Sequence, residues 1–94
     1  MNNLNSKIWV FHGSGARFAS GVFLSLNKAE DWISNHKLTG VLTGYPIDEG
    51  VYDWALKNNY FNIKKASETE SAFIQSFTCA GLEHFHFEEG NKET

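Results

Sequence analysis

The sequence predicts an α+β fold, in which a mixed sheet of about four to five strands is covered by two to three helices. Two observations favour this class. Short runs of aromatic and β-branched residues have the character of strands, and apolar residues at spacings of three and four mark helices between them. The length of 94 residues indicates a single domain spanning 1–94, with an ordered core at about 7–89.

Local signals place each element along the chain in the order β-β-α-β-α-(β)-α-β. The bracketed strand has the weakest signal. Strands are expected at 7–12, 18–24, 41–45, 60–65 and 83–88. Helices are expected at 26–37, 48–59 and 68–78. The polar tail after residue 89 is expected to fray.

Side chains that accept hydrogen bonds from free N–H groups stand at the start of each expected helix. Ser25 or Asn27 would cap the first helix, and Asp48 would cap the second. Ser67 and Glu70 have the spacing of a capping box for the third helix.

The core is expected to form where the apolar stripes of strands and helices meet. Trp9 and Phe11 share one face of the first strand, and Ile8 and Val10 share the other. Because both faces are apolar, this strand is expected to be central. The residues expected to be buried are Trp9, Val10, Phe23, Ile33, Val41, Ala55, Leu56, Phe73, Ile74 and Phe77.

Composition argues against several classes of function. The formal net charge is −3, and the basic residues are scattered apart from the adjacent Lys64 and Lys65. A nucleic-acid surface needs a concentrated positive patch, and a polybasic membrane anchor needs the same. No apolar run approaches the roughly 20 residues of a membrane helix, and the N-terminus lacks a secretory signal. A cytoplasmic protein without nucleic-acid or membrane partners is therefore expected.

The run EHFHFEEG at 83–90 holds the first candidate site. On a strand, His84 and His86 project to one face, where two imidazoles can chelate one ion. His12, at the end of the first strand, is a possible third ligand for zinc. The plainer interpretation is a solvent-facing row of histidines, with Phe85 and Phe87 supplying the buried face. A polar pocket that holds an organic ligand or an anion is the third alternative.

Two other segments invite a catalytic interpretation. HGSGAR at 12–17 lacks the third glycine of a dinucleotide fingerprint and the Gly-Lys-Ser/Thr of a Walker loop, so a hairpin turn is favoured. Cys79 is the single cysteine, which excludes an intrachain disulfide and a C-x-x-C motif. A lone cysteine near a helix end is more typical of a core than of a nucleophile. No catalytic residue and no cofactor are therefore assigned.

The segment YPIDEGVYDW at 45–54 holds the second candidate site, in which amphipathic rings alternate with acids. Tyr and Trp often carry interface energy, and acids around them steer a basic partner. The competing interpretation is that the acids complement a helix dipole and that Tyr52 is core. The expected partner-binding residues are Tyr45, Asp48, Glu49, Tyr52, Asp53 and Trp54.

Several motifs together resemble a group of small bacterial domains known as a domain of unknown function. These motifs are WVFHG at 9–13, GVF at 21–23, A-x-x-W-I at 29–33, LTGVLTGYPIDEGVYDWA at 38–55 and HFHFEEG at 84–90. The Y-P-x-D-x-G-x-Y-x-W stretch and the H-x-H strand are the most distinctive. The resemblance implies one complete bacterial domain and carries no activity, cofactor or catalytic residue.

The sequence favours a small binding protein without catalytic activity over an enzyme. One form of this hypothesis is an immunity protein that neutralises a toxin, because acidic proteins of this size suit basic toxin domains. The alternative is a small metal- or ligand-binding domain, or an enzyme, that uses His12, His84 and His86.

Overall fold

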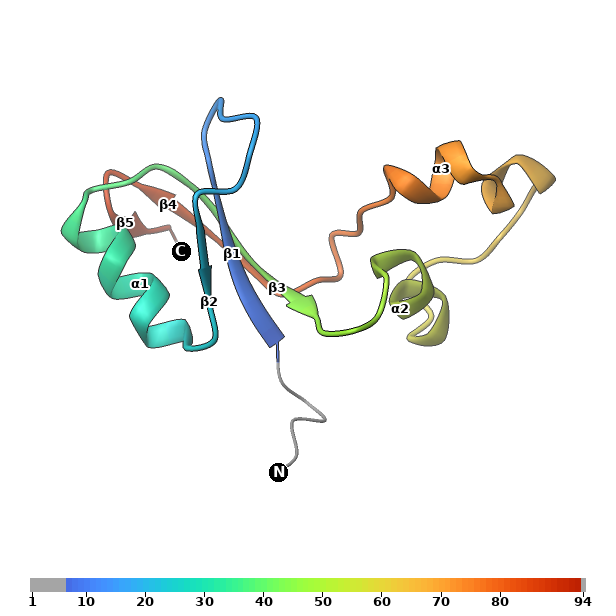
Figure 1. The fold of residues 1–94 in the computed structure, drawn as a ribbon, viewed down its shortest axis with the longest axis horizontal. Helices are drawn as coiled ribbons and strands as arrows, with labels where there is room; N and C mark the ends of the chain where they lie inside the picture. Colours follow the sequence, from blue (N-terminus) through green and yellow to red (C-terminus); the bar gives the residue numbers. More distant parts are fainter. Residues whose placement is uncertain (1–6, 94) are drawn as a thin grey trace. The chain divides into compact units, whose positions relative to one another are not determined.

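The computed structural model describes residues 7–93, and the contacts among them define two compact units. The first unit comprises the described residues of Met1–Ile47 and Leu82–Thr94, and the second comprises Asp48–Gly81. The first unit contains the sheet and one helix, and the second contains short helices joined by loops (Figure 1). Each unit is described by itself.

The first unit is a five-stranded sheet with strand order β2-β1-β3-β4-β5. The strands are β1 (Lys7–Gly13), β2 (Gly21–Phe23), β3 (Gly40–Pro46), β4 (His84–Glu88) and β5 (Asn91–Lys92). The α+β class and the central position of β1 are confirmed. The sheet is antiparallel at every pairing of its described strands, so the expectation of a mixed sheet was wrong. The strands that α1 connects, β2 and β3, do run in the same direction. They are not hydrogen-bonded to each other, because β1 lies between them.

Helix α1 (Leu26–Asn35) covers one face of this sheet. It begins as expected, because the Ser25 hydroxyl accepts a hydrogen bond from the Lys28 backbone N–H at 3.2 Å. It ends two residues before the expected boundary. Lys37 adopts a left-handed φ of 56°. The backbone N–H groups of Lys37 and Leu38 donate hydrogen bonds to the carbonyl oxygens of Ser34 and Ile33, and these bonds end the helix.

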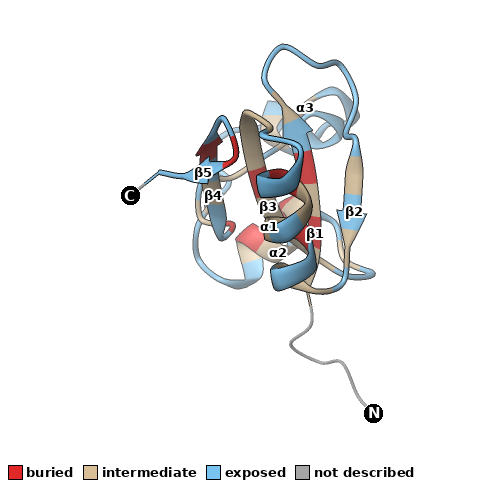
Figure 2. Cartoon of the chain, turned by 90° about the vertical axis from the view of Figure 1, so that its left-hand side faces the viewer, coloured by how far each residue is buried: buried red, intermediate tan, exposed pale blue. Residues whose placement is uncertain are grey.

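The core of the first unit lies between α1 and the facing side of β1, β3 and β4 (Figure 2). Burial of Trp9 and Ile33 is confirmed. The expectation for Val10 and Val41 was wrong, because both are only half-buried and lie on the opposite face of the sheet. The buried side chains of this core are Trp9, Phe11, Ala29, Ile33, Leu42 and Phe87.

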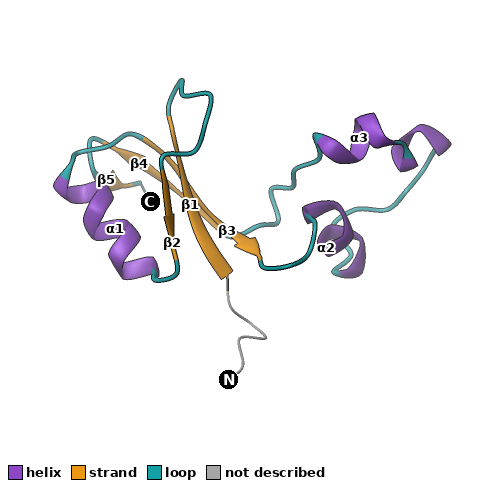
Figure 3. Ribbon diagram, viewed as in Figure 1, coloured by secondary structure: helices purple, strands orange, loops and turns teal. Residues whose placement is uncertain are grey.

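The second unit contains helices α2 (Val51–Lys57) and α3 (Ser71–Gln75) and the 3-10 helix η1 (Ala66–Thr69). The expected strand at 60–65 is a loop (Figure 3). The expected helix at 68–78 is two short helical segments, and it is not capped by Ser67 because α3 begins after Glu70. Asp48 does not cap α2 either. It has a left-handed φ of 63°, whereas a cap residue needs an extended backbone, and Gly50 takes that position.

Aromatic rings hold the second unit together. Tyr52 lies at the centre, with its ring 5.5–6.2 Å from the rings of Phe61, Phe73 and Phe77. Rings at these separations attract one another beyond the area that they bury. Among the residues expected to be core in this unit, Ala55 is buried, whereas Leu56, Phe73 and Phe77 are half-buried and Ile74 is exposed.

The end of the described chain is more ordered than expected. Asn91 and Lys92 pair with Glu88 and Phe87 as strand β5. The Lys92 ammonium lies 4.3 Å from the centre of the Phe85 ring, a cation–π contact that ties β5 to its neighbour. Within residues 7–93, none of the helices has the length and apolar character needed to span a bilayer.

Candidate functional site

Strand pairing brings two of the three candidate histidines together on the sheet face opposite α1. His12 on β1 pairs with Val41 on β3, and Val41 pairs with His86 on β4. The two imidazoles therefore flank Val41 in one row across the sheet. His84 follows on the same face of β4, with its ring centre 5.3 Å from that of His86. The expected strand and its common histidine face are confirmed.

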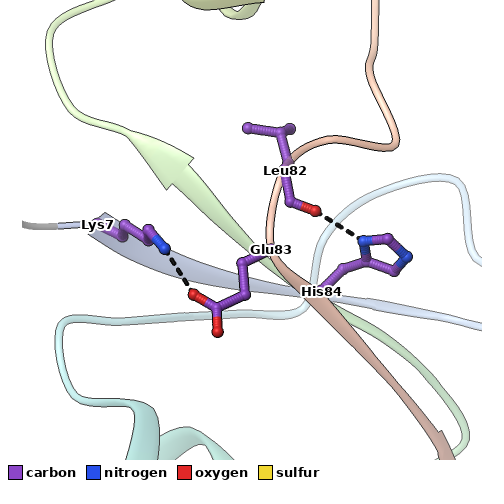
Figure 4. A network of polar contacts seen from close by, with 4 residues as sticks. All are labelled: Lys7, Leu82, Glu83 and His84. Atoms are coloured by element: carbon purple, nitrogen blue, oxygen red, sulfur yellow. Dashed lines mark hydrogen bonds and ion pairs between the residues drawn. The ribbon is translucent and has the colours of Figure 1, made fainter. Parts of the chain in front are cut away.

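Local hydrogen bonds occupy one nitrogen of two of these rings. The His12 Nε2 lies 2.6 Å from the Ala16 carbonyl oxygen, and the His84 Nδ1 lies 2.7 Å from that of Leu82 (Figure 4). Since a carbonyl oxygen only accepts, each of these nitrogens carries the proton. The same figure shows Glu83 paired with Lys7. The Lys7 Nζ lies 2.6 Å from the Glu83 Oε1, and this exposed ion pair contributes little stability. One nitrogen remains for a ligand on His12 and on His84.

A cleft of about 520 Å³ opens beside His12 and His86 in the first unit. His84 does not line this cleft, although its ring lies beside that of His86. Sequence reasoning missed Glu93 in this cleft, because it belongs to a tail that was expected to fray. The lining residues are His12, Gly13, Ser14, Thr39, Gly40, Val41, Tyr45, His86, Phe87, Glu88 and Glu93.

No group of three or more His, Cys, Asp or Glu side chains within residues 7–93 has an arrangement that would hold a metal ion. Zinc needs at least three protein ligands at about 2.0–2.3 Å. The exposed imidazoles of His84 and His86 supply two.

We therefore expect native protein, purified without a nickel column, to contain no stoichiometric zinc or iron. The physical reason is that a pair of imidazoles on a solvent-facing strand binds a metal weakly without a third ligand. Elemental analysis of wild type and of His84→Ala measures this. Stoichiometric metal in wild type that is lost in His84→Ala would overturn the expectation.

The second candidate site, at 45–54, is divided between the two units. Tyr45 lies on β3 in the first unit, and the other candidates lie in the second unit. Tyr52 is only 8% exposed, and its hydroxyl donates a 2.7 Å hydrogen bond to the Glu68 carbonyl oxygen. Tyr52 is thus a core residue of the second unit and offers no ring to a partner.

The acids of this segment differ in their surroundings. Glu49 is paired with Lys57 at 2.8 Å across the length of α2. Asp53 is exposed in the first turn of α2, where a carboxylate also complements the helix dipole. Asp48 is exposed on the turn before the helix. No ion pair in the described part of the chain involves Asp48 or Asp53, so both carboxylates face solvent.

A stacked pair of rings belongs to the same unit as these acids. Trp54 is half-buried and stacks on Tyr60, with ring centres 5.2 Å apart and planes inclined by 12°. Tyr60 is 57% exposed. Its ring also lies against Gly81, where an added Cβ would be 2.6 Å from the ring. Sequence reasoning missed Tyr60 because it was assigned to a strand. We call Asp48, Asp53, Trp54 and Tyr60 the α2 surface.

The fold and these surfaces define a small α+β protein with an antiparallel sheet and a separate aromatic helical unit. The chain belongs to the family described as a domain of unknown function, DUF7710, whose model matches residues 8–93. This confirms the expected resemblance to a domain of unknown function over nearly the whole chain. No curated protein and no solved structure shows significant similarity to the chain.

Proposed function

We propose that this protein functions by binding another protein, and that it does so through the α2 surface. The single observation that carries the proposal is the stacked Trp54–Tyr60 pair, in which Tyr60 keeps 57% of its surface exposed. Stacking holds the two rings in one arrangement before a partner arrives, so that binding orders fewer side chains. Tyr and Trp are also the residue types that contribute most often to interface energy.

The carboxylates of Asp48 and Asp53 give the partner its chemical character. Exposed acids without an ion pair attract a basic surface, and they belong to the polar rim that surrounds the rings in such interfaces. The formal net charge of −3 acts in the same direction over longer range. The partner is therefore a basic protein, and a toxin domain that this chain neutralises as a cytoplasmic immunity protein is the form of the hypothesis that we favour.

A second candidate function rests on the cleft beside His12 and His86. Two imidazoles and the carboxylates of Glu88 and Glu93 line it, a set that suits a small polar ligand. The genes next to this one separate the two functions: a toxin gene directly upstream favours the immunity function, and a metabolic operon favours the ligand-binding function.

Reversing the charge of the α2 surface tests the first function. We expect tagged wild-type protein to capture a basic protein from cells of its own host, and we expect an Asp48→Lys, Asp53→Lys double variant to lose most of that capture. The reason is that two attractive charges become repulsive at the rim. Mass spectrometry of the captured material from both proteins measures this.

The matched control is the double variant Asp31→Lys, Glu89→Lys in the first unit. Asp31 is an exposed helical acid like Asp53, and Glu89 has a left-handed φ of 52°, close to the 63° of Asp48. Each pair of replacements changes the formal net charge from −3 to +1. Equal capture by both double variants would show that the α2 surface is not the binding site, provided that circular dichroism shows both to be folded.

A further inference from the structure

The sheet of the first unit has one edge that carries charged side chains and one edge that carries none. β5 forms one edge, and it is short and carries Lys92 beside Glu93. Charged side chains at an edge discourage the addition of another strand. β2 forms the other edge and pairs only with β1, so the outer side of its backbone has no strand partner among the described residues.

The β2 edge is also short, with three residues, but it lacks the charged residues and the proline that commonly protect an edge. The segment FASGVFLSLN at 18–27 contains no charged residue and no proline. It also contains the three most exposed large apolar side chains of the described chain, namely Phe18 at 75%, Val22 at 60% and Leu24 at 78%. β2 has no buried residue (Figure 2). An apolar, uncharged strand edge of this kind is a template for pairing with another strand.

We propose that β2 pairs antiparallel with β2 of a second copy of this chain, about a two-fold axis that passes through Val22. Val22 is the middle residue of β2, so a symmetric antiparallel pairing places it opposite its counterpart. The two five-stranded sheets then form one continuous sheet. Val22 and Leu24 lose much of their contact with water, because cross-strand neighbours lie about 4.5–5.5 Å apart at Cβ.

The absence of charge along this edge suits a second copy as the occupant. Two copies that each carry a net charge of −3 repel each other at long range. A two-fold contact brings each residue near its own counterpart, so any charge in the contact would meet a like charge. The segment 18–27 is free of charge over its whole length and therefore tolerates its own copy. This segment shares no residue with the α2 surface.

Light scattering on purified protein tests the pairing without any other component, so its outcome is independent of the proposed function. We expect the mass of wild type to rise from one chain towards two as concentration increases. Val22→Lys places two like charges opposite each other and should weaken the dimer by about tenfold or more. Leu24→Lys should act in the same direction, and it lies outside the strand, so it leaves the β1–β2 pairing intact. Thr78→Lys, an exposed position in the second unit, adds the same charge as a control and should dimerise like wild type.

A disulfide cross-link tests the position of the axis. In a Cys79→Ser background, Val22→Cys should form a covalent dimer under mild oxidation, because opposing Cβ atoms about 4.5–5.5 Å apart need only a small shift to reach the roughly 3.5–4.5 Å of a disulfide. Thr78→Cys in the same background should not.

The proposal is overturned if wild type stays monomeric at all concentrations, or if it forms a dimer that Val22→Lys leaves as tight as before. It is equally overturned if Val22→Cys forms no more covalent dimer than Thr78→Cys.

Discussion

Ile33→Ala is expected to lower the free energy of unfolding by about 2–5 kcal/mol. Ile33 lies on the inner face of α1 with no exposed surface, and it is among the largest fully buried side chains of the described chain, with Phe11 and Leu42. Removing its side chain leaves a cavity at the centre of the contact between helix and sheet. The cost includes both the lost transfer energy and that cavity.

Denaturant unfolding followed by circular dichroism measures this effect. The neighbouring exposed Ser34 provides the control, because Ser34→Ala changes the same helix without touching the core and should shift stability by less than about 0.5 kcal/mol. An Ile33→Ala midpoint equal to that of wild type would show that α1 does not pack on the sheet as described.

Gly40→Ala is expected to destabilise the first unit by about 1–3 kcal/mol or more. A Cβ at Gly40 would lie 2.4 Å from the His12 carbonyl oxygen and 2.8 Å from both the Gly13 Cα and the Phe11 Cζ. Two of these atoms belong to the backbone of the paired strand β1, so relief requires the strands to separate. The substitution therefore disturbs the β1–β3 ladder and the core beneath it.

The residue opposite Gly40 supplies a matched control. Gly13 pairs with Gly40 across the ladder, but a Cβ at Gly13 would meet nothing closer than 3.8 Å, which is ordinary contact. Gly13→Ala should therefore be tolerated. If thermal or denaturant unfolding gives the two variants the same stability, the close approach of β1 and β3 at Gly40 is contradicted.

The elements of the first unit could be predicted because pattern and packing agree there. β1, β3 and β4 are rich in aromatic or β-branched residues, and α1 has a capped start and an apolar stripe. Which face of β1 the helix α1 covers could not be predicted from the sequence pattern. Val10 and Phe11 are both apolar, and only the position of α1 decides that Phe11 is buried and Val10 half-exposed.

The second unit shows where local signals fail. YFNIKK at 60–65 has the composition of a strand, yet no neighbouring strand pairs with it within the described residues, and Phe61 instead stacks on Phe73. The left-handed turn at Asp48 moves the start of α2 to Val51. The first outcome depends on contacts among rings that are distant in sequence, which spacing alone does not reveal.

The same limit applies to the candidate sites. Alternation in EHFHFEEG was sufficient to place His84 and His86 on one face, but the strand order decides that His86 shares a cleft with His12 and that His84 does not. Tyr52 and Tyr60 are residues of one type in neighbouring segments. Packing makes the first a core residue and leaves the second on the surface.

The central claim, that the α2 surface binds a basic protein, is tested most directly by the salt dependence of affinity for the captured partner. Titration calorimetry at low and high salt should show wild-type affinity falling as salt rises, since exposed charges are screened. At low salt, Asp48→Lys, Asp53→Lys should bind about tenfold more weakly, which corresponds to about 1.4 kcal/mol, and with a shallower dependence on salt. Asp31→Lys, Glu89→Lys, which makes the same change in net charge away from the α2 surface residues, should bind more tightly than Asp48→Lys, Asp53→Lys and closer to wild type. Equal affinity and equal salt dependence for both double variants would contradict the claim.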